Sequence, residues 1–496
     1  MNIDLDMTMI DCQLFKVRLL WEFIDKILHL KDSQVKGLSY VPATNAIHLG
    51  KDHKLHLCFQ RKYHNDLWND FIRVLPEIKL QNGDDTFIIP NGYAVYDGDL
   101  EVSPDEIQDF DIKINRLDYG HVEDKQKQYW RYVYPVKSNV WFLQIESLIY
   151  KDDNGRITNF SYLKPVVGND DTHVFVTTEK DEHYMVIQSG SKIDAEEMYK
   201  RVFAIMTSIG LITGYKYGDY HFQIASDDED FGTIKSIIFG SIEKTRYCNY
   251  RIVNSKWADT YNMLGRYEYQ KYAQEKVKEC ADDPNIYYDN KPAEARVFYG
   301  LVNLLYNHND LAISASMLLE GGLLNIIYQP PFFHIALETI TSALIDSTQE
   351  VIKPPMEKKE YNKIVKPVLV DALNNIPGLS DDAKRIYTRR VENNLNSCAN
   401  QDKLSKCFEN VGYILTKEDK EAIQKRNSTL HGHLSDIKKE LPDQQWDMFA
   451  VALRLHKLCC ILLLKAAGYS GRILNNEVIL GVKEACERKD SPYIYI

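Results

Sequence analysis

The spacing of apolar residues changes once along this chain, and this change limits the possible folds more than any other feature of the sequence. Between about Val35 and Asn254, β-branched and aromatic residues come in short runs separated by turn signals such as Asn-Gly and Asp-Gly. Runs of this kind predict strands joined by tight turns. From Ala293 onward, apolar residues recur every three or four positions, which predicts amphipathic helices. We therefore expect an α+β protein with a β-rich N-terminal half and an all-α helical bundle in the C-terminal half.

The N-terminal half also contains helical signals. The strand pattern is clearest in three runs, Leu55–Phe59, Trp130–Tyr134 and His173–Val176. Ile193–Leu211 has helical spacing instead, with Asp194 placed to begin the helix and Gly214 near its end. Cys12–Leu30 has the same spacing and predicts a short leading helix. We expect an antiparallel sheet that carries an inserted helix.

The chain is too long for one typical core, since it has 496 residues. We expect a β-rich sensor or specificity domain at residues 1–255, a helical connector at 256–292 and an all-α domain at 293–496. The last long helix is predicted from Pro442 to Ala467, with Gly468 as its cap.

Composition predicts a cytoplasmic protein. The net charge of −11 argues against a protein that coats nucleic acid generally. Nine cysteines lack any metal-binding or disulfide pattern, and Cys459 and Cys460 are predicted to be small core residues. The acidic N-terminus lacks a signal-peptide pattern, and the most apolar run, Leu458–Leu464, is too short to span a bilayer. We expect no membrane association.

The residues best suited to chemistry lie in Arg426–Gly432. A capping box of Thr416 and Asp419 predicts the start of the helix that carries them, and Gly432 is placed to end it. The segment places a guanidinium, a carboxamide and an imidazole within two turns. No other segment gathers an anion-binding group and a near-neutral proton-transfer group so closely.

These residue types match metal-free RNA cleavage, in which the 2′-hydroxyl of RNA is the nucleophile. His431 suits the proton transfers because the pKa of a free imidazole is about 6.5. Arg426 suits the charged phosphorane because its fork donates two parallel hydrogen bonds. Asn427 shares a helix face with His431, whereas Arg426 diverges from it by roughly 140° on an ideal helix. A full cycle needs two proton-transfer groups, which His433 or a second copy in a symmetric dimer could supply.

Arg-x4-His, with Asn after the Arg and Gly after the His, resembles the active-site motif of HEPN-domain ribonucleases. Phe333–Ile340 is similar to the Ala-Leu-Glu helix of the ApeA-like branch of that superfamily. The run from Ile386 to Arg426 also resembles the helix before that branch's motif. A large β-rich region before a C-terminal HEPN domain is the layout of the same branch. The resemblance therefore covers the helical half most strongly.

The resemblance implies an endoribonuclease that cleaves single-stranded RNA, such as tRNA, in abortive antiphage defence. It implies catalytic Arg426 and His431 with Asn427 assisting, and Glu338 as a buried acidic partner of Arg426. It further implies a homodimer through the helical domain and a phage-derived trigger or inhibitor. We expect no cofactor and no metal.

Two other patterns have alternative interpretations. Lys384, Arg385, Arg389 and Arg390 form a short basic stripe that could follow an RNA backbone or could be a solvated helix face. Glu338 could equally form an ordinary surface salt bridge, and His433 could be a loop residue. The rival functional interpretation is a non-enzymatic HEPN-like bundle that binds RNA or protein. A metal-dependent nuclease fits poorly because no carboxylate pair accompanies the motif.

Overall fold

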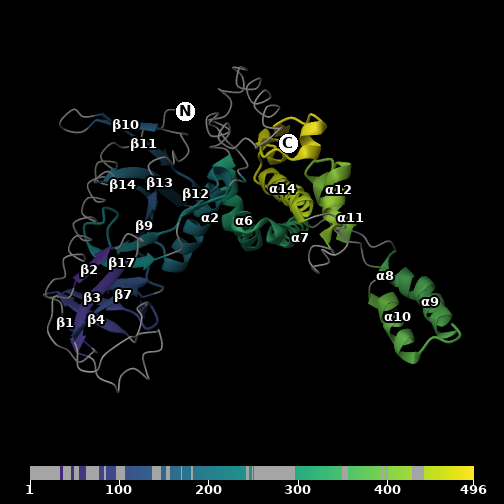
Figure 1. The fold of residues 1–496 in the computed structure, drawn as a ribbon, viewed down its shortest axis with the longest axis horizontal. Helices are drawn as coiled ribbons and strands as arrows, with labels where there is room; N and C mark the ends of the chain where they lie inside the picture. The colour runs from purple at the N-terminus through teal and green to yellow at the C-terminus, as the bar shows by residue number, and fades with distance from the viewer. Residues whose placement is uncertain are drawn as a thin grey trace. The chain divides into compact units, whose positions relative to one another are not determined.

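The computed structural model describes two compact units (Figure 1). The first contains the described residues up to Tyr250 together with 297–307, and the second contains those from His308 onward. The described ranges are 34–36, 46–49, 55–62, 77–82, 85–96, 107–123, 125–136, 147–151, 157–168, 170–179, 182–241, 245–248, 250, 297–348, 356–393, 395–396, 400–426 and 441–496. The leading helix predicted at Cys12–Leu30 and the connector helix predicted from Trp257 to Asn285 lie outside these ranges.

A large antiparallel sheet forms the first unit, as the strand pattern predicted. Its order is β1 (Gln34–Lys36), β4 (Ile78–Asn82), β5 (Asp85–Ile89), β8 (Arg116–Gly120), β17 (Ile234–Ser241), β16 (Tyr220–Ser226), β9 (Tyr129–Val136), β14 (Glu182–Ser189), β13 (Asp170–Glu179), β11 (Ile157–Leu163) and β10 (Ser147–Lys151), with β12 (Val166–Val167) paired to β13. A second sheet has the order β2 (Ala46–Leu49), β3 (Leu55–Lys62), β7 (Ile107–Ile114) and β6 (Ala94–Tyr96). Two short strands, β15 (Tyr215–Lys216) and β18 (Arg246–Tyr247), form a separate ribbon.

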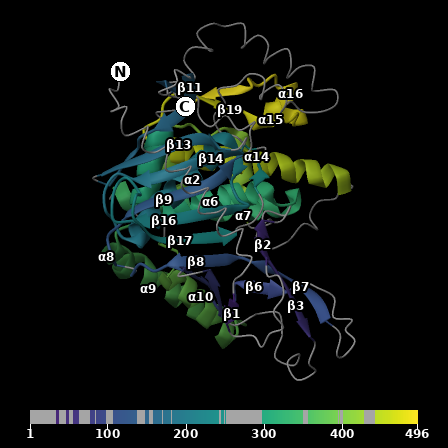
Figure 2. The ribbon, with the colours of Figure 1, turned by 90° about the vertical axis from the view of Figure 1, so that its left-hand side faces the viewer.

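The core of this unit centres on β9, which is buried on both faces and pairs with β14 and β16 (Figure 2). The inserted helix, α2 (Ala195–Thr213), begins and ends as predicted. The Asp194 side chain accepts a hydrogen bond from the amide of Glu197, and Gly214 takes a left-handed conformation with φ of 76°. The indole of Trp130 on β9 donates to the carbonyl of Ile193 at 2.9 Å, which ties the start of the helix to the sheet.

Residues 297–307 form a helix that belongs to the β-rich unit, although the sequence analysis grouped them with the helical half. Two tyrosine hydroxyls explain the grouping. Tyr306 donates to Glu197 on α2 at 2.7 Å, and Tyr299 accepts from the backbone amide of Lys164 at 3.4 Å. These long-range contacts do not alter helical periodicity, so the sequence pattern could not reveal them.

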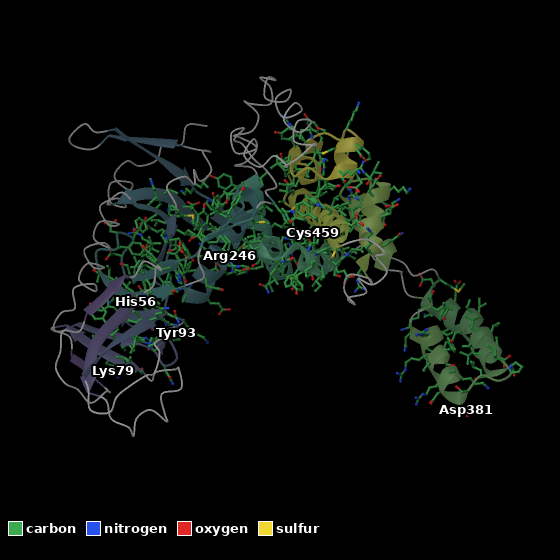
Figure 3. All side chains as sticks on the ribbon, in the orientation of Figure 1. His56, Lys79, Tyr93, Arg246, Asp381 and Cys459 are labelled. Atoms are coloured by element: carbon green, nitrogen blue, oxygen red, sulfur yellow. The ribbon has the colours of Figure 1, made fainter. Side chains whose placement is uncertain are left out.

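The second unit is helical and is built around α6 (Asn309–Leu323), α7 (Gln329–Thr348) and α14 (Leu441–Ala466). α6 and α7 approach closely at Gly321, where a Cβ atom would lie 2.7 Å from the ring of Phe333. Cys459 and Cys460 on α14 are buried, as predicted, and Cys459 faces the carbonyl of Phe333 at 3.6 Å (Figure 3). Gly468 follows α14 with φ of 77°, which confirms the predicted cap.

The unit also contains smaller elements. They are η2 (Ile326–Tyr328), α8 (Lys358–Glu360), the π-helical turn η3 (Tyr361–Val365), α9 (Lys366–Asn374), α10 (Asp381–Asn393), α11 (Asn400–Asn410), α12 (Lys417–Gln424), α15 (Asn476–Ile479) and α16 (Lys483–Glu487). The ribbon of β19 (Arg472–Leu474) and β20 (Tyr493–Tyr495) adds two short strands to a region that the sequence predicted to be all-α. Among the described helices, none is both long and apolar enough to cross a membrane.

Candidate functional site

The candidate site depends on α12, the helix that leads to Arg426. It begins with the capping box that the sequence predicted. The Thr416 hydroxyl accepts from the amide of Asp419 at 3.1 Å, and the Asp419 carboxylate accepts from the amide of Thr416 at 3.0 Å. This reciprocal pair satisfies two backbone donors that an isolated helix would leave unpaired.

A buried network of charges fixes the start of α12 to α14 and α15. Asp419 is fully buried and lies 3.2 Å from the ammonium of Lys457 on α14, which also contacts Glu477 at 3.0 Å. Arg454, one turn earlier on α14, pairs with Glu477 through both carboxylate oxygens. The Tyr413 hydroxyl donates to Asp419 at 3.1 Å. Buried charges are tolerated when each has a partner, and here each carboxylate has one.

The network shifts the pKa values of its acids. Burial acts to raise the pKa of Asp419, but Lys457 and the hydrogen bonds from Thr416 outweigh it and hold the pKa below its usual value. Burial likewise opposes ionisation of Glu477, whereas Lys457 and Arg454 lower its pKa overall. Both carboxylates are therefore charged at neutral pH.

α12 ends at Gln424, so the single helix predicted from Thr416 to Gly432 is interrupted at Lys425. Lys425 has ψ of −1°, and its amide is bonded to the carbonyls of Glu421 and Ile423. Ala422 and Ile423 are the buried apolar residues of this last turn. The angular separation of Arg426 and His431 stays a prediction, because His431 lies outside the described residues.

Arg426 forms a two-point ion pair with Glu338 on α7. Its Nη2 donates to Glu338 Oε2 at 3.0 Å, and its Nε contacts Oε1. The side chains are 32% and 31% exposed, so the pair is half-buried. An arginine carries five N–H donors, and Glu338 takes two of them. The contact expected from the sequence is present, but Glu338 is less buried than expected.

His334 lies one turn before Glu338 on α7, and the sequence analysis did not single it out. It is 2% exposed, and its Nε2 has no hydrogen-bond partner among the described residues. Burial, with a smaller contribution from the charge of Arg426, lowers the pKa of His334 to about 4. The imidazole is therefore neutral near pH 7. The His334–Glu338 spacing of four residues was the available sequence signal, because it places both side chains on one helix face.

Three predicted site residues, Asn427, His431 and His433, lie outside the described residues. Their roles therefore remain predictions. The catalytic role of Arg426 and the supporting role of Glu338 also remain predictions, although the structure brings these two side chains together across 88 positions of sequence.

The predicted basic stripe lies on α10, which packs against α9. Lys384 donates to the carbonyl of Asn374 at 3.0 Å and so completes the end of α9. Arg385 lies 3.3 Å from Asp382 in an exposed pair. Arg389 and Arg390 lie on the same helix, and the two contacts described here for Lys384 and Arg385 are made within the α9–α10 hairpin.

The arrangement can bind an anion beside a neutral imidazole without a metal. Among the described side chains, no group of three His, Cys, Asp or Glu residues could hold a metal ion. No protein-family model, curated protein or solved structure matches the chain.

Proposed function

We propose that this protein is a metal-independent endoribonuclease that cleaves single-stranded RNA by attack of the 2′-hydroxyl. The observation that carries the proposal is the half-buried Arg426, whose side chain is 32% exposed and is oriented by its ion pair with Glu338. An arginine with a fixed plane is suited to a phosphate because it offers parallel charge-assisted hydrogen bonds. Its position just after α12 places it five residues before His431 in the chain.

The reaction needs two proton transfers and one site of charge stabilisation. A base removes the proton of the 2′-hydroxyl, whose oxygen then attacks the adjacent phosphorus. The bond to the 5′-oxygen breaks, and an acid protonates that oxygen, which leaves a 2′,3′-cyclic phosphate and a 5′-hydroxyl. Arg426 would stabilise the phosphorane, His431 would transfer protons, and Asn427 would orient His431 or a phosphate oxygen.

His334 offers a second imidazole within the same subunit. Because its pKa is lowered to about 4, it would be uncharged at neutral pH and could accept a proton but would rarely carry one. We assign it as a candidate positioning group or base beside Arg426. The alternative source of a second proton-transfer group is the His431 of a second copy, as the proposed homodimer through the helical unit would require.

The proposed biological role follows from the resemblance to ApeA-like HEPN ribonucleases. In this role the protein acts in the cytoplasm during abortive antiphage defence, and its substrate is tRNA or another RNA of translation. The β-rich unit would hold the activity in check until a phage-derived trigger arrives. The β-rich unit, including the helix at 297–307, would form this regulatory part, and the helical unit from His308 onward would form the catalytic part.

One observation favours a second function, a non-enzymatic module that binds RNA or protein. Glu338 already neutralises the charge of Arg426 through two contacts. A guanidinium satisfied in this way could serve only to fix residue 426 against α7. Both functions use the same residues, and they differ in whether RNA is cut.

Cleavage of labelled RNA by the full-length protein in EDTA separates these functions. The proposal predicts cutting in EDTA that is abolished by Arg426→Ala and by His431→Ala. Arg488→Ala is the matched control, because Arg488 is an exposed arginine outside the predicted catalytic and RNA-binding residues, and we expect it to retain cutting activity. Cutting only with Mg²⁺ would instead indicate a metal-dependent nuclease. Binding without cutting, in the presence of activating phage components, would support the binding module.

A further inference from the structure

Residues 356–393 form a helical hairpin that is closed by its own contacts. At its base, the amide of Met356 donates to the side chain of Asn396 at 3.1 Å, and the Asn396 amide group donates back to the carbonyl of Met356 at 2.7 Å. The Tyr361 hydroxyl donates to the carbonyl of Val391 at 2.5 Å and joins the two arms. At the other end, Lys384 donates to the last turn of α9. Figure 3 labels Asp381 at that end.

The hairpin buries almost none of its apolar side chains. Neither α9 nor α10 contains a buried residue, and Tyr361 is the buried side chain of the hairpin as described. Five large apolar residues are instead exposed, with accessible fractions of 57% for Ile364, 66% for Val368, 44% for Ile376, 51% for Ile386 and 44% for Tyr387. Two short helices rarely persist in water on propensity alone, and their stability comes from burying an apolar face. The hairpin therefore has an apolar surface that suits a partner.

The charges along α10 indicate what that partner is. The first turn is acidic, with Asp381 and Asp382, whereas the last turn is basic, with Arg390. Asp382, Ile386 and Arg390 follow one another at four-residue spacing, so they lie on one side of the helix. If two copies of α10 cross antiparallel with Ile386 at the twofold axis, each Asp382 lies beside the Arg390 of the other copy. A surface that complements itself in this way is the requirement for a twofold dimer.

We propose that the α9–α10 hairpin is a dimerisation surface and that its partner is the hairpin of a second copy of this chain. The two hairpins bury Ile386 and Tyr387 against each other and exchange Asp382–Arg390 ion pairs. The observed pair of Asp382 and Arg385 does not oppose this exchange, because both side chains are highly exposed, at 84% and 77%. Such a pair is held weakly.

RNA is a less suitable occupant of the same surface. The side of α10 that would face it carries Asp382 and the exposed Ile386 beside Arg390, and neither the aspartate nor the isoleucine is complementary to a phosphate backbone. Lys384, one of the four predicted RNA-binding residues, is bonded within the hairpin. The inference does not depend on nuclease activity, so a failure to cut RNA would leave it intact.

Sedimentation velocity of the full-length chain over a range of concentrations tests the proposal. We expect the wild type to be a dimer and Ile386→Asp to be a monomer. Ile414→Asp is the matched control, because Ile414 is an isoleucine outside the hairpin that is 89% exposed, and this variant should remain a dimer. Charge reversal supplies a second test that does not threaten folding. Asp382→Arg and Arg390→Asp should each weaken the dimer by about tenfold or more, and the double variant should restore it.

Cross-linking then locates the twofold axis. The variant Ile386→Cys should form a disulfide between two chains under mild oxidation, whereas Ile414→Cys should not. A monomeric wild type would overturn the proposal, and so would a dimer that is unaffected by Ile386→Asp and by charge reversal. Loss of RNA binding in Ile386→Asp with no change in mass would assign the surface to RNA. A monomer that melts at a lower temperature in Ile386→Asp would show that the same chain covers the surface.

Discussion

The two ends of α12 are both held by ion pairs, but the pairs are built differently. At its start, Asp419 is fully buried and Lys457 is 12% exposed, within a network that also contains Glu477 and Arg454. At its end, Arg426 and Glu338 are each exposed by about a third of their side-chain area. Ion pairs of the same kind therefore occur in a buried and in a half-exposed setting within about two helical turns of chain.

This difference suggests separate purposes. A buried charge must keep its partner, because an unpaired charge in the interior is very costly, so the first network serves to fix α12. A half-exposed pair contributes little to stability, since water screens it. The Arg426 side chain is 32% exposed, and the carboxylate of Glu338 holds its orientation. The buried network at the start of α12 thus fixes the helix that leads to Arg426.

The same substitution at the two ends should have very different effects on stability. Glu477→Gln leaves Arg454 and Lys457 short of a buried negative charge and should lower the free energy of unfolding by about 3–5 kcal/mol. Glu338→Gln should lower it by less than about 1 kcal/mol. Urea denaturation of both variants measures the difference. Equal losses in the free energy of unfolding would show that the buried and the half-exposed ion pairs contribute equally to stability.

Replacing Arg426 by lysine keeps the charge but removes the fork. We expect Arg426→Lys to reduce RNA cleavage by about a hundredfold, since removal of one stabilising donor typically has that effect. The free energy of unfolding should change by less than about 0.5 kcal/mol. Arg454→Lys is the matched control at the buried end, where stability rather than rate should suffer. A fully active Arg426→Lys variant would show that geometry at this position is unimportant.

A decrease in pH should lower the stability contributed by the groups near the two ends of α12 in different pH ranges. Burial lowers the pKa of His334 to about 4 and that of His456 to about 3, from an ordinary value of 6.5. As the pH falls, these histidines are protonated in the unfolded chain at a higher pH than in the folded chain. The free energy of unfolding should therefore decrease as the pH drops below about 6.5. Asp419 and Glu477 have lowered pKa values, from ordinary values of 3.8 and 4.5, so their contribution is present above those values and is lost as the pH falls below them.

Melting temperatures recorded from pH 7.5 to pH 3 would show both ranges. His334→Asn should reduce the decline in melting temperature between pH 6.5 and 4. Asp419→Asn should lower the melting temperature at neutral pH and reduce its decline below pH 4. A melting temperature that stays constant from pH 7 to pH 4.5 would contradict the burial of neutral histidines.

The smallest effect concerns the cap of α12. Thr416→Ala removes the side-chain acceptor for the amide of Asp419 and should cost about 1 kcal/mol of stability. Thr416→Ser keeps the acceptor and should be nearly neutral. Denaturation curves of the two variants test this, and equal losses would mean that the hydroxyl is not the stabilising group.

Local features of the fold were predictable because their causes lie within a few residues. Asp194 and Gly214 mark the ends of α2, and Thr416 with Asp419 marks the start of α12, since a capping side chain and a left-handed glycine act on their own turn. Alternating β-branched and aromatic residues likewise predicted β9 and β13. The same local signals do not show where a helix packs, which is why residues 297–307 were assigned to the other half.

The candidate site was only partly predictable for the same reason. Arg426 and Glu338 came from motifs, and their contact is present. The network of Lys457 and Glu477 was not predicted, because lysines and glutamates that become buried look like surface residues in sequence. His334 was missed because its four-residue spacing from Glu338 is common in helices, and its burial and its interaction with the charge of Arg426 depend on distant parts of the chain.

Analysis of the new RNA ends tests the central claim most directly. RNA cut by the full-length protein in EDTA should carry a 2′,3′-cyclic phosphate on one fragment and a 5′-hydroxyl on the other, as mass spectrometry can detect, and Arg426→Ala should abolish both. Fragments that end in a 3′-hydroxyl, or that appear only when Mg²⁺ is added, would contradict attack by the 2′-hydroxyl at a metal-free arginine site.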